Sequence, residues 1–321
     1  MNERAGRLPS TIRVSYGTAI ALGLCEARQE VAPTTAYLLW DPGCRGACSF
    51  CPRAGGNARS DRLSRVAWPE WPWADVVRRL REQPGPLRRI CLQTGWHDSA
   101  AAVLPLCIAA LQTTRLPLSL TLHPAQVPLV DALLALGLDH VGIGLDAATP
   151  ATYAQHKQRE WAADWPRLAA ALDRHGPRLE IHLIFGLGDR EQDFLATVEA
   201  ILQRGGLVAL FAFTPAANGQ GCPPELGAWR RVQAFRHLRQ TGVITLTQCR
   251  FDQRGRLRSF GLSPEELHER LADGLAFQTS GCPDCNRPFY NERPGGPLFN
   301  FPRALTREEA RQAIAELDLD L

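Results

Sequence analysis

The sequence has no hydrophobic segment long enough to be a secretory signal peptide or a membrane span. The apolar stretch at residues 19–24 is too short for either, and the first seven residues are mostly charged or polar. An internal repeat and a low-complexity linker are also missing, which argues against a repeat array or a string of loosely joined domains. We therefore expect a cytoplasmic globular protein with no membrane contact.

An excess of charge of one sign is missing as well. The 36 Lys and Arg residues nearly balance the 33 Asp and Glu residues, and the net charge of +3 is too small to indicate binding to nucleic acid. Ten cysteines are present. In a reducing cytoplasm, cysteines are better explained as metal ligands and core residues than as disulfides.

The chain is large enough to bury a substantial core, with 321 residues and a hydrophobic content of 45%. Short apolar runs alternate with helical patterns, which predicts parallel βαβ units. Six or seven such units form a full or partial TIM-like parallel (βα) barrel, whose chemistry lies at the carboxyl ends of its strands. The predicted strands are 36–40, 89–93, 118–122, 140–145, 179–185, 208–213 and 243–247, and the predicted helices are 73–81, 100–112, 129–136, 165–174, 194–204 and 228–239.

This α/β pattern divides the chain into three regions. Residues 1–35 are expected to form an N-terminal helical extension, and residues 36–248 the barrel. Residues 249–321 contain a run rich in proline and glycine at 281–296 and end in a helix. We predict that this C-terminal region is an irregular extension that binds a metal cluster.

Three cysteines lie within eight residues of one another, shortly after the first predicted strand: Cys44, Cys48 and Cys51. Three thiolates on a short glycine-containing loop can hold three irons of a [4Fe–4S] cluster and leave the fourth iron free for another ligand. The alternatives are three ordinary buried cysteines or a zinc knuckle, but structural zinc sites usually pair two Cys-x2-Cys hooks. The Cys-x3-Cys-x2-Cys spacing therefore favours a cluster with one open iron.

This loop, with the aromatic Phe50 directly before its last cysteine, resembles the cluster loop of the radical S-adenosylmethionine (SAM) superfamily. The resemblance implies that the open iron chelates SAM and that an electron from the cluster cleaves SAM to a 5′-deoxyadenosyl radical. It also implies SAM contacts at the ends of later strands. These are Thr94 and Gly95 beside the amino group, Asp146 at the ribose, and Gly186 and Gly188 in a turn beside the adenine.

Each of these later contacts has a plainer explanation. Gly186 and Gly188 also fit ordinary barrel turns, where glycine supplies a positive φ. Asp146 fits a turn residue as well as a ligand contact, and Asp189 is expected to cap a helix. No acidic residue follows Gly95, so contact with the SAM amino group would fall to backbone carbonyls.

A second pair of cysteines, Cys282 and Cys285, lies in the C-terminal run that is too rich in proline and glycine for a helix or strand. A Cys-x2-Cys bend lets two thiolates converge on one metal atom or one corner of a cluster. We predict that Cys249, at the end of the last predicted strand, joins them as ligand of an auxiliary [4Fe–4S] cluster. A structural zinc is the alternative, because the spacing suits zinc equally well. Three other cysteines have no partner spacing and are assigned to the core: Cys25, Cys91 and Cys107.

The fourth position of this auxiliary cluster is open to several groups. Cys222, in the loop after the sixth strand, is the best cysteine candidate, although a hydroxyl of Ser280 or Ser259 would also serve. Arg287 or Arg293 is a candidate to ligate or hydrogen-bond the cluster. Solvent exposure, or packing on an aromatic residue, fits these two arginines equally well.

Three segments, 12–19, 92–95 and 281–296, are similar to the biotin synthase and lipoyl synthase branch of the superfamily, and most resemble one subunit of the two-protein lipoyl synthase. The resemblance implies that a substrate radical takes sulfur from the auxiliary cluster. The implied substrate is the octanoyl chain of a lipoyl carrier protein. The implied partners are that carrier, a second radical SAM lipoyl synthase subunit and an electron donor such as ferredoxin or flavodoxin. The chain departs from the single-protein lipoyl synthase, which has N-terminal auxiliary cysteines, because no cysteine precedes Cys25.

Three other functions fit the same residues. A radical SAM maturase or dehydrogenase would use the second cluster only to relay electrons and would return it intact. A biotin synthase-like enzyme would insert sulfur into another small substrate. A non-catalytic iron–sulfur or zinc protein would not cleave SAM at all.

Overall fold

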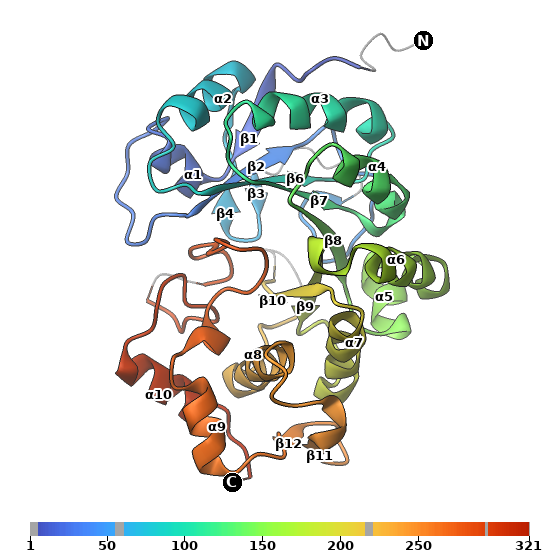
Figure 1. Ribbon diagram of the computed structural model, residues 1–321, viewed down its shortest axis with the longest axis vertical. Coiled ribbons are helices and arrows are strands. Elements are labelled where there is room, and N and C mark those ends of the chain that lie inside the picture. Colours follow the sequence, from blue (N-terminus) through green and yellow to red (C-terminus); the bar gives the residue numbers. More distant parts are fainter. Residues whose placement is uncertain (1–5, 55–60, 216–220, 293–294, 321) are drawn as a thin grey trace.

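The structure, a computed structural model, describes residues 6–54, 61–215, 221–292 and 295–320. Within these ranges the centre is an eight-stranded sheet, of which six strands run parallel in the order β10-β9-β8-β7-β6-β2 (Figure 1). Strand β1 continues the sheet beyond β2 and is antiparallel to it, and β5 is in turn antiparallel to β1. The predicted α/β fold with a partial parallel barrel is therefore confirmed. The strands are β1 (Thr11–Val14), β2 (Thr35–Trp40), β5 (Glu70–Pro72), β6 (Arg89–Thr94), β7 (Leu118–Leu122), β8 (His140–Asp146), β9 (Leu179–Phe185) and β10 (Leu207–Ala212).

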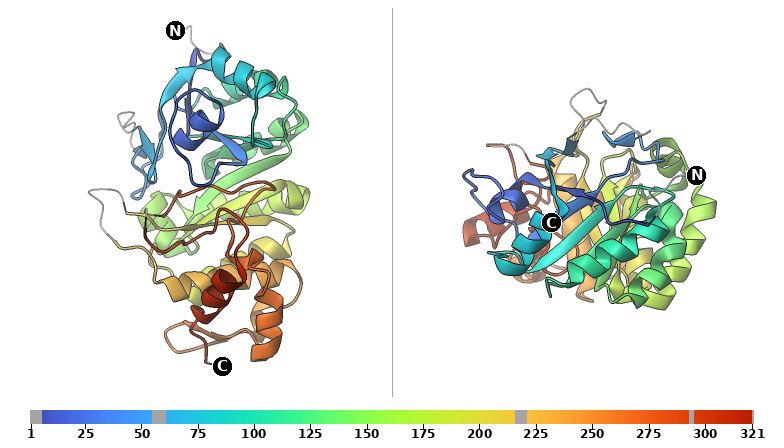
Figure 2. Two further views of the ribbon diagram at one scale, coloured as in Figure 1. Left: turned by 90° about the vertical axis from the view of Figure 1, so that its left-hand side faces the viewer. Right: turned by 90° about the horizontal axis from the view of Figure 1, so that it is seen from above.

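Helices connect consecutive strands and cover the outer face of the sheet (Figures 1 and 2). The helices α2 and α9 lie toward opposite ends of the long axis (Figure 1). None of the helices in the described part of the chain has the length and apolarity needed to cross a membrane. The helices are α2 (Trp73–Glu82), α3 (Ala100–Gln112), α4 (Val130–Ala135), α5 (Pro150–Lys157), α6 (Trp161–His175), α7 (Glu191–Gln203), α8 (Leu226–Gln240), α9 (Pro264–Leu271) and α10 (Arg307–Ala315), and the 3-10 helices are η2 (Pro124–Leu129), η3 (Gly176–Arg178), η4 (Leu246–Gln248) and η5 (Leu275–Phe277).

The parallel strands alternate between apolar and polar side chains. In β6, the buried Ile90 and Leu92 belong to the main core, while Cys91 between them points to the opposite, interior face of the barrel. In β9, Glu180 and His182 alternate in the same way with core leucines and isoleucine. Parallel strands buried on both faces normally form continuous apolar runs. The alternation therefore marks a barrel interior built for polar groups.

The N-terminal region departs from the predicted helical extension. It contains one short helix, α1 (Tyr16–Ala21), and the preceding β1 is a strand that pairs with β2 and β5. After the cysteine loop, a small hairpin of β3 (Arg62–Leu63) and β4 (Val66–Ala67) stands beside the barrel. The N-terminal residues therefore extend the sheet itself.

The predicted strand at residues 243–247 is not formed. The N–H of Ile244 bonds back to the carbonyl of Leu238 at the end of α8, and the Ile244 side chain is buried. Thr245 then starts the 3-10 helix η4 through a capping box with the residue three positions later. Cys249 follows this short helix and not a barrel strand. The prediction that it lies at the end of a strand was therefore wrong.

The chain between η5 and α10 is irregular in its described residues, apart from one isolated bridge. This segment, called the tail below, runs along the free edge of β10, where the Ser280 hydroxyl accepts from Leu210 N (2.8 Å) and Asn291 Nδ2 donates to Ala212 O (2.9 Å). It also reaches the start of β2, because the Thr35 hydroxyl donates to a tail carbonyl, at residue 284 (2.8 Å). The tail therefore closes the side of the barrel that the sheet leaves open.

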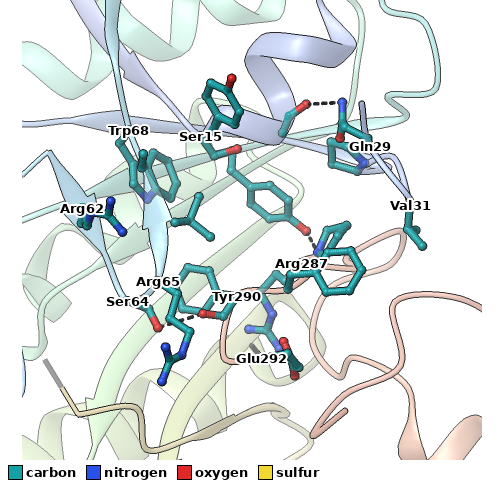
Figure 3. A pocket seen from close by; sticks show the side chains of 18 of the residues that line it. Ser15, Gln29, Val31, Arg62, Ser64, Arg65, Trp68, Arg287, Tyr290 and Glu292 are labelled. Atoms are coloured by element: carbon teal, nitrogen blue, oxygen red, sulfur yellow. Dashed lines mark hydrogen bonds between the residues drawn. The ribbon is translucent and has the colours of Figure 1, made fainter. Parts of the chain in front are cut away.

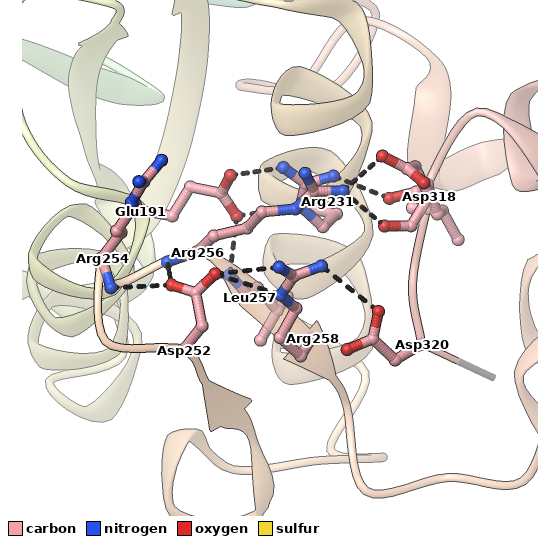
Figure 4. A network of polar contacts seen from close by, with 10 residues as sticks. Glu191, Arg231, Asp252, Arg254, Arg256, Leu257, Arg258, Asp318 and Asp320 are labelled. Atoms are coloured by element: carbon pink, nitrogen blue, oxygen red, sulfur yellow. Dashed lines mark hydrogen bonds and ion pairs between the residues drawn. The ribbon is translucent and has the colours of Figure 1, made fainter.

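A polar network fixes the C-terminal residues to the helical layer (Figure 4). Arg231 of α8 is buried and donates to Glu191 at the start of α7 (Nε–Oε2, 2.9 Å) and to the carbonyl of Leu317 (2.8 Å). The strands β11 (Arg250–Phe251) and β12 (Leu257–Ser259) form a small hairpin. Arg256, on the loop before β12, pairs with Asp318. Removing one partner of a buried ion pair leaves an uncompensated charge, so this network holds the end of the chain firmly.

Candidate functional site

The three clustered cysteines lie on the loop that follows β2. Cys48 is buried, and Cys44 and Cys51 are partly buried. The backbone N–H groups of Gly46 and Trp96 lie 3.3 and 3.4 Å from Cys44 Sγ and donate to it. These two donors hold the Cys44 side chain between its own loop and the residues that follow β6.

Backbone contacts hold this loop against two neighbouring strand ends. The N–H of Arg45 donates to the carbonyl of Trp96 (2.9 Å), which follows β6. The N–H of Ser49 donates to the carbonyl of His156 in α5 (2.9 Å), and the Ser49 hydroxyl also bonds His156 Nδ1 (2.8 Å). The carboxyl ends of β2, β6 and β8 therefore contribute to one site.

Burial raises the pKa of Cys48 and raises the pKa of Cys51 to about 12. The positive charge of Lys157 acts in the opposite direction on both thiols but does not overcome burial. Without a metal, the thiols of Cys48 and Cys51 are therefore protonated at neutral pH, and binding of a metal cluster has to release their protons.

Gly95 lets the cysteine loop approach the end of β6. A Cβ at this position would lie 3.0 Å from Cys44 Cβ and 3.2 Å from Cys44 Sγ. Its neighbour Thr94 donates its hydroxyl to the carbonyl of Thr121 (2.8 Å) and lines the same cavity. The close approach alone explains why glycine is required at position 95.

We expect that Gly95→Ala displaces Cys44 and lowers both the iron content of the first cluster and the rate of SAM cleavage. Displacements of a fraction of an ångström at a reacting centre justify an expected loss in rate of about tenfold. Gly227→Ala is a matched control, because its Cβ would meet the carbonyl of Glu316 at the same 3.0 Å, away from the site. Iron analysis and SAM cleavage with dithionite measure the effect, and equal losses in both variants would contradict the role of Gly95.

Asp146 lies beside the cysteines but is paired within the protein. Its backbone has φ +67°, and its Oδ2 accepts from Lys157 Nζ at 2.7 Å. Burial by itself lowers the pKa of Lys157, but the charge of Asp146 and its hydrogen bond raise the pKa. Lys157 is therefore a buried ammonium ion next to the metal-binding thiols. It offsets part of the negative charge of a thiolate-bound cluster or of an anionic cofactor.

The sequence analysis missed Lys157 and also His123, which lies at the carboxyl end of β7. Its ring stacks on Trp96, with centroids 5.2 Å apart, and its Nε2 is buried with no hydrogen-bond partner among the described residues. Burial lowers the pKa of His123 to about 2, so the ring is neutral. Its position directly after a parallel strand was the available signal, because such ends meet at the mouth of a barrel.

These residues enclose a cavity of about 240 Å³ at the carboxyl ends of the strands. Three thiols, an unpaired imidazole nitrogen and a buried ammonium group fit a three-thiolate cluster with a polar organic cofactor. Thr94, Gly95 and Asp146 also line this cavity, and their contact with SAM stays a prediction. Gly186 and Gly188, both at φ +110°, lie in the turn after β9 and outside the lining of this cavity.

Asp189 has the structural role expected for it, but on another helix. Its Oδ1 accepts from the hydroxyls of Thr149 (2.8 Å) and Thr152 (2.6 Å), at the start of α5. Its own following helix, α7, begins at Arg190 without a side-chain cap. Asp189 therefore joins the turn after β9 to the helix that carries Lys157.

The second pair of cysteines lies in the barrel interior, toward the amino ends of the strands. Cys282 Sγ is 3.5 Å from the Ser119 hydroxyl near the start of β7, and Cys285 Sγ is 3.5 Å from the Tyr37 hydroxyl in β2. Burial and the charge of Glu180 raise the pKa of Cys282. No group of three His, Cys, Asp or Glu side chains in the described ranges, these cysteines included, is arranged around a single metal ion.

The structure does not bring Cys249 to this pair. Cys249 Sγ donates to the carbonyl of Thr245 at 3.8 Å, and burial together with the charge of Glu199 in α7 raises its pKa to about 12. Cys222 is exposed. The Ser280 hydroxyl accepts from the backbone of β10.

The other residues proposed for the auxiliary site are also dispersed. Ser259 lies in the hairpin of β11 and β12, where its hydroxyl accepts from the N–H of Gly261 (3.1 Å). Arg287 is buried beside Cys285, whereas Arg293 lies outside the described residues. Cys107 is a core residue of α3, as predicted, and Cys25 packs at the edge of the core.

A larger cavity, of about 1100 Å³, opens beside the first (Figure 3). It lies between α1, the β3–β4 hairpin and the tail, and Arg287 and Tyr290 of the tail point into it. The two cavities share Ser64, Gln93 and Tyr290 as lining residues, so they adjoin. Tyr37 also lines the larger cavity, and Cys285 therefore lies one side chain behind its wall.

A partial (βα) barrel with a three-cysteine loop after its first parallel strand defines a class of enzymes that start radical reactions at an iron–sulfur cluster. A family model described as the radical SAM superfamily matches residues 40–201, just over half of the chain. The chain belongs to the radical SAM superfamily. Membership implies one [4Fe–4S] cluster, for which Cys44, Cys48 and Cys51 are the candidate ligands, and SAM.

Similar solved structures agree with this fold. A structure of HydG, a maturase of the [FeFe]-hydrogenase, has a TM-score of 0.53 and 13% identity over 66% of this chain and 51% of that chain. HydG from Carboxydothermus hydrogenoformans has a TM-score of 0.51 and 16% identity over 74% and 55%. The chain thus spans about half the length of these proteins, and at such identities the likeness shows the fold alone. No curated protein matches the chain in sequence.

Proposed function

We propose that this protein is a radical SAM sulfurtransferase, one subunit of a two-protein lipoyl synthase, which inserts sulfur into the octanoyl chain of a lipoyl carrier protein. One observation carries the proposal: the same barrel holds a second cysteine pair, Cys282 and Cys285, behind a cavity that adjoins the first cysteine set. A second [4Fe–4S] cluster at that pair would be the sulfur source. This arrangement serves an enzyme that generates a radical at one end of a cavity and traps it at the other.

When bound, the cluster and SAM supply a 5′-deoxyadenosyl radical, which removes a hydrogen atom from a methylene that acid–base chemistry cannot activate. Each insertion replaces one C–H bond by one C–S bond and consumes one SAM and one electron from a donor such as ferredoxin or flavodoxin. A second cluster held at Cys282 and Cys285 would supply the sulfide for the C–S bond and would accept the one electron that this bond formation releases. The barrel residues position the methylene and keep water out.

The larger cavity has the chemistry expected for an acylated lysine arm. Apolar side chains, among them Ile20, Val31 and Trp68, line its body and suit an eight-carbon chain. Arg28 and Arg62 also line it and are exposed, so they lie where an acidic carrier domain would dock. Such docking steers association through charge and weakens with salt.

We expect that this protein alone converts an octanoyl-lysine peptide only to a monothiolated product. One auxiliary cluster would surrender one sulfur before it falls apart, whereas a lipoyl group needs two at inequivalent carbons. A second radical SAM subunit would then complete the dithiolane. Mass spectrometry of the peptide after anaerobic reaction with SAM and dithionite measures the product, and the same reaction without SAM is the control.

The outcomes of this experiment separate the candidate functions. Full lipoylation by this chain alone would refute the two-protein assignment. Absence of sulfur from the product under any pairing, with iron and sulfide counts unchanged after turnover, would favour a maturase or dehydrogenase with an electron-relay cluster. Absence of SAM cleavage would favour a non-catalytic metal protein.

A further inference from the structure

We infer that the second iron–sulfur cluster is held inside the barrel by Cys91 together with Cys282 and Cys285, and not by Cys249 or Cys222. This ligand set rests on the proposed presence of a second cluster. It does not depend on which reaction that cluster performs.

The register of the sheet places Cys91 between the two residues that the tail cysteines contact. Tyr37 of β2 is the partner of Cys91 in β6, and Cys91 is in turn the partner of Ser119 in β7. Partner residues on parallel strands point to the same face, and neighbouring strands lie about 4.8 Å apart. Cys285 contacts Tyr37 and Cys282 contacts Ser119, each at 3.5 Å. The tail cysteines therefore straddle Cys91 across the barrel interior.

The packing around Cys91 agrees with this placement. Cys91 and Cys285 pack against the same small cluster of buried side chains, which includes Tyr37 and is separate from the main core. The hydroxyl of Thr121 lies 3.9 Å from Cys91 Sγ. The tail backbone also bends sharply around Cys285, with φ +63° at Asp284 and φ +33° at Arg287. These uncommon conformations direct the two tail thiols toward β6.

A buried cation lies beside these thiols. Arg287 is only 9% exposed, and its guanidinium group donates to the carbonyls of Leu210 (3.3 Å) and Ser280 (2.8 Å) while lying 3.9 Å over the ring of Phe211. The buried carboxylate of Glu180 interacts with Arg287 through its charge, although no carboxylate among the described residues accepts a hydrogen bond from Arg287. Three metal-bound thiolates would add negative charge beside this guanidinium group.

The rejected candidates lack these features. The thiol of Cys249 donates to a backbone carbonyl, and it interacts with Glu199 on the outer helix α7. Cys222 is exposed at the wall of the larger cavity. With three thiolates, one iron of the second cluster stays open. The Ser119 hydroxyl, 3.5 Å from Cys282 Sγ, is one oxygen that the structure places near that position. The Glu180 carboxylate, which also hydrogen-bonds Cys282, is another.

The test compares iron retention in a chain whose first site is removed. The background is the full-length chain with Cys44, Cys48 and Cys51 all changed to alanine, reconstituted anaerobically with iron and sulfide. Adding Cys91→Ala is expected to lower the residual iron and acid-labile sulfide by at least about tenfold, because a three-ligand site loses a ligand. Adding Cys249→Ala or Cys222→Ala is expected to leave both unchanged.

Controls keep the result interpretable. Cys107→Ala removes an equally small buried thiol from helix α3 and is expected to retain the iron, and circular dichroism shows whether each variant is folded. If Cys91→Ala is unfolded, Cys91→Ser preserves the shape, and its altered Mössbauer spectrum replaces iron loss as the readout. Full iron with an unchanged spectrum in a Cys91 variant, iron loss in the Cys249 variant, or zinc in place of iron would each overturn this ligand set. A failure to insert sulfur would refute the proposed function alone, since no readout here uses product.

Discussion

Replacing Cys44, Cys48 and Cys51 together by alanine is expected to abolish SAM cleavage while leaving an iron–sulfur absorbance. These three thiols are the candidate ligands of the cluster whose open iron would bind SAM, and no other described thiol lines that cavity. If each site holds four irons, about half of the iron should remain at the second site. Anaerobic reconstitution, iron analysis and detection of 5′-deoxyadenosine with dithionite measure the effect.

The matched control for this variant is Cys107→Ala, which should cleave SAM at the rate of the unchanged protein. The control thiol is completely buried in α3, away from both cavities. Loss of all iron in the triple variant would contradict two independent sites. Continued SAM cleavage would show that these cysteines are not the ligands.

Replacing Cys282 and Cys285 by alanine is expected to preserve SAM cleavage and to abolish the thiolated product. Radical generation depends on the first cavity, so SAM cleavage should persist, and sulfur delivery depends on the tail, so no thiolated peptide should form. SAM consumed without product is the signature of this uncoupling. Mass spectrometry of the octanoyl peptide and quantification of 5′-deoxyadenosine measure the two halves in one sample.

The tail also closes the barrel, so a folding defect has to be separated from the loss of a ligand. The double variant with serine at both positions preserves most of the packing against Tyr37 and Ser119. Both variants should unfold at temperatures close to that of a Cys249→Ala control. A thiolated product from either variant, or zinc bound at the unchanged site, would exclude the role of the tail as sulfur donor.

Local spacing was enough to find the features whose parts are neighbours in the chain. The loop of Cys44 to Cys51 and the pair Cys282 and Cys285 each lie within eight residues, so their thiols are brought together by a single turn. Six of the seven predicted strands were right, because apolar runs between helices mark buried parallel strands. The remaining run, 243–247, was misread. Its Thr245 and Gln248 have the pattern of a helix capping box, and that local preference prevailed over β-branched composition.

Features that depend on strand register were not accessible in this way. Cys91 resembles any small buried residue until Tyr37 and Ser119 are seen beside it in the sheet. Lys157 and His123 likewise reach the first site only because three strand ends converge there. The alternation of polar and apolar residues along β6 and β9 was the one local signal of a polar interior, since parallel strands are usually apolar on both faces.

The way the tail closes the barrel sets an order in time. Cys44, Cys48 and Cys51 leave the ribosome together and early, whereas Cys285 meets Tyr37 across 248 positions of chain. The ligands of the first cluster are therefore adjacent long before the second set exists as a site. If the interior holds the proposed second cluster, its iron can be delivered only after synthesis has passed the tail. Under the proposed function, a chain stalled or clipped before that point would start a radical with no sulfur to quench it.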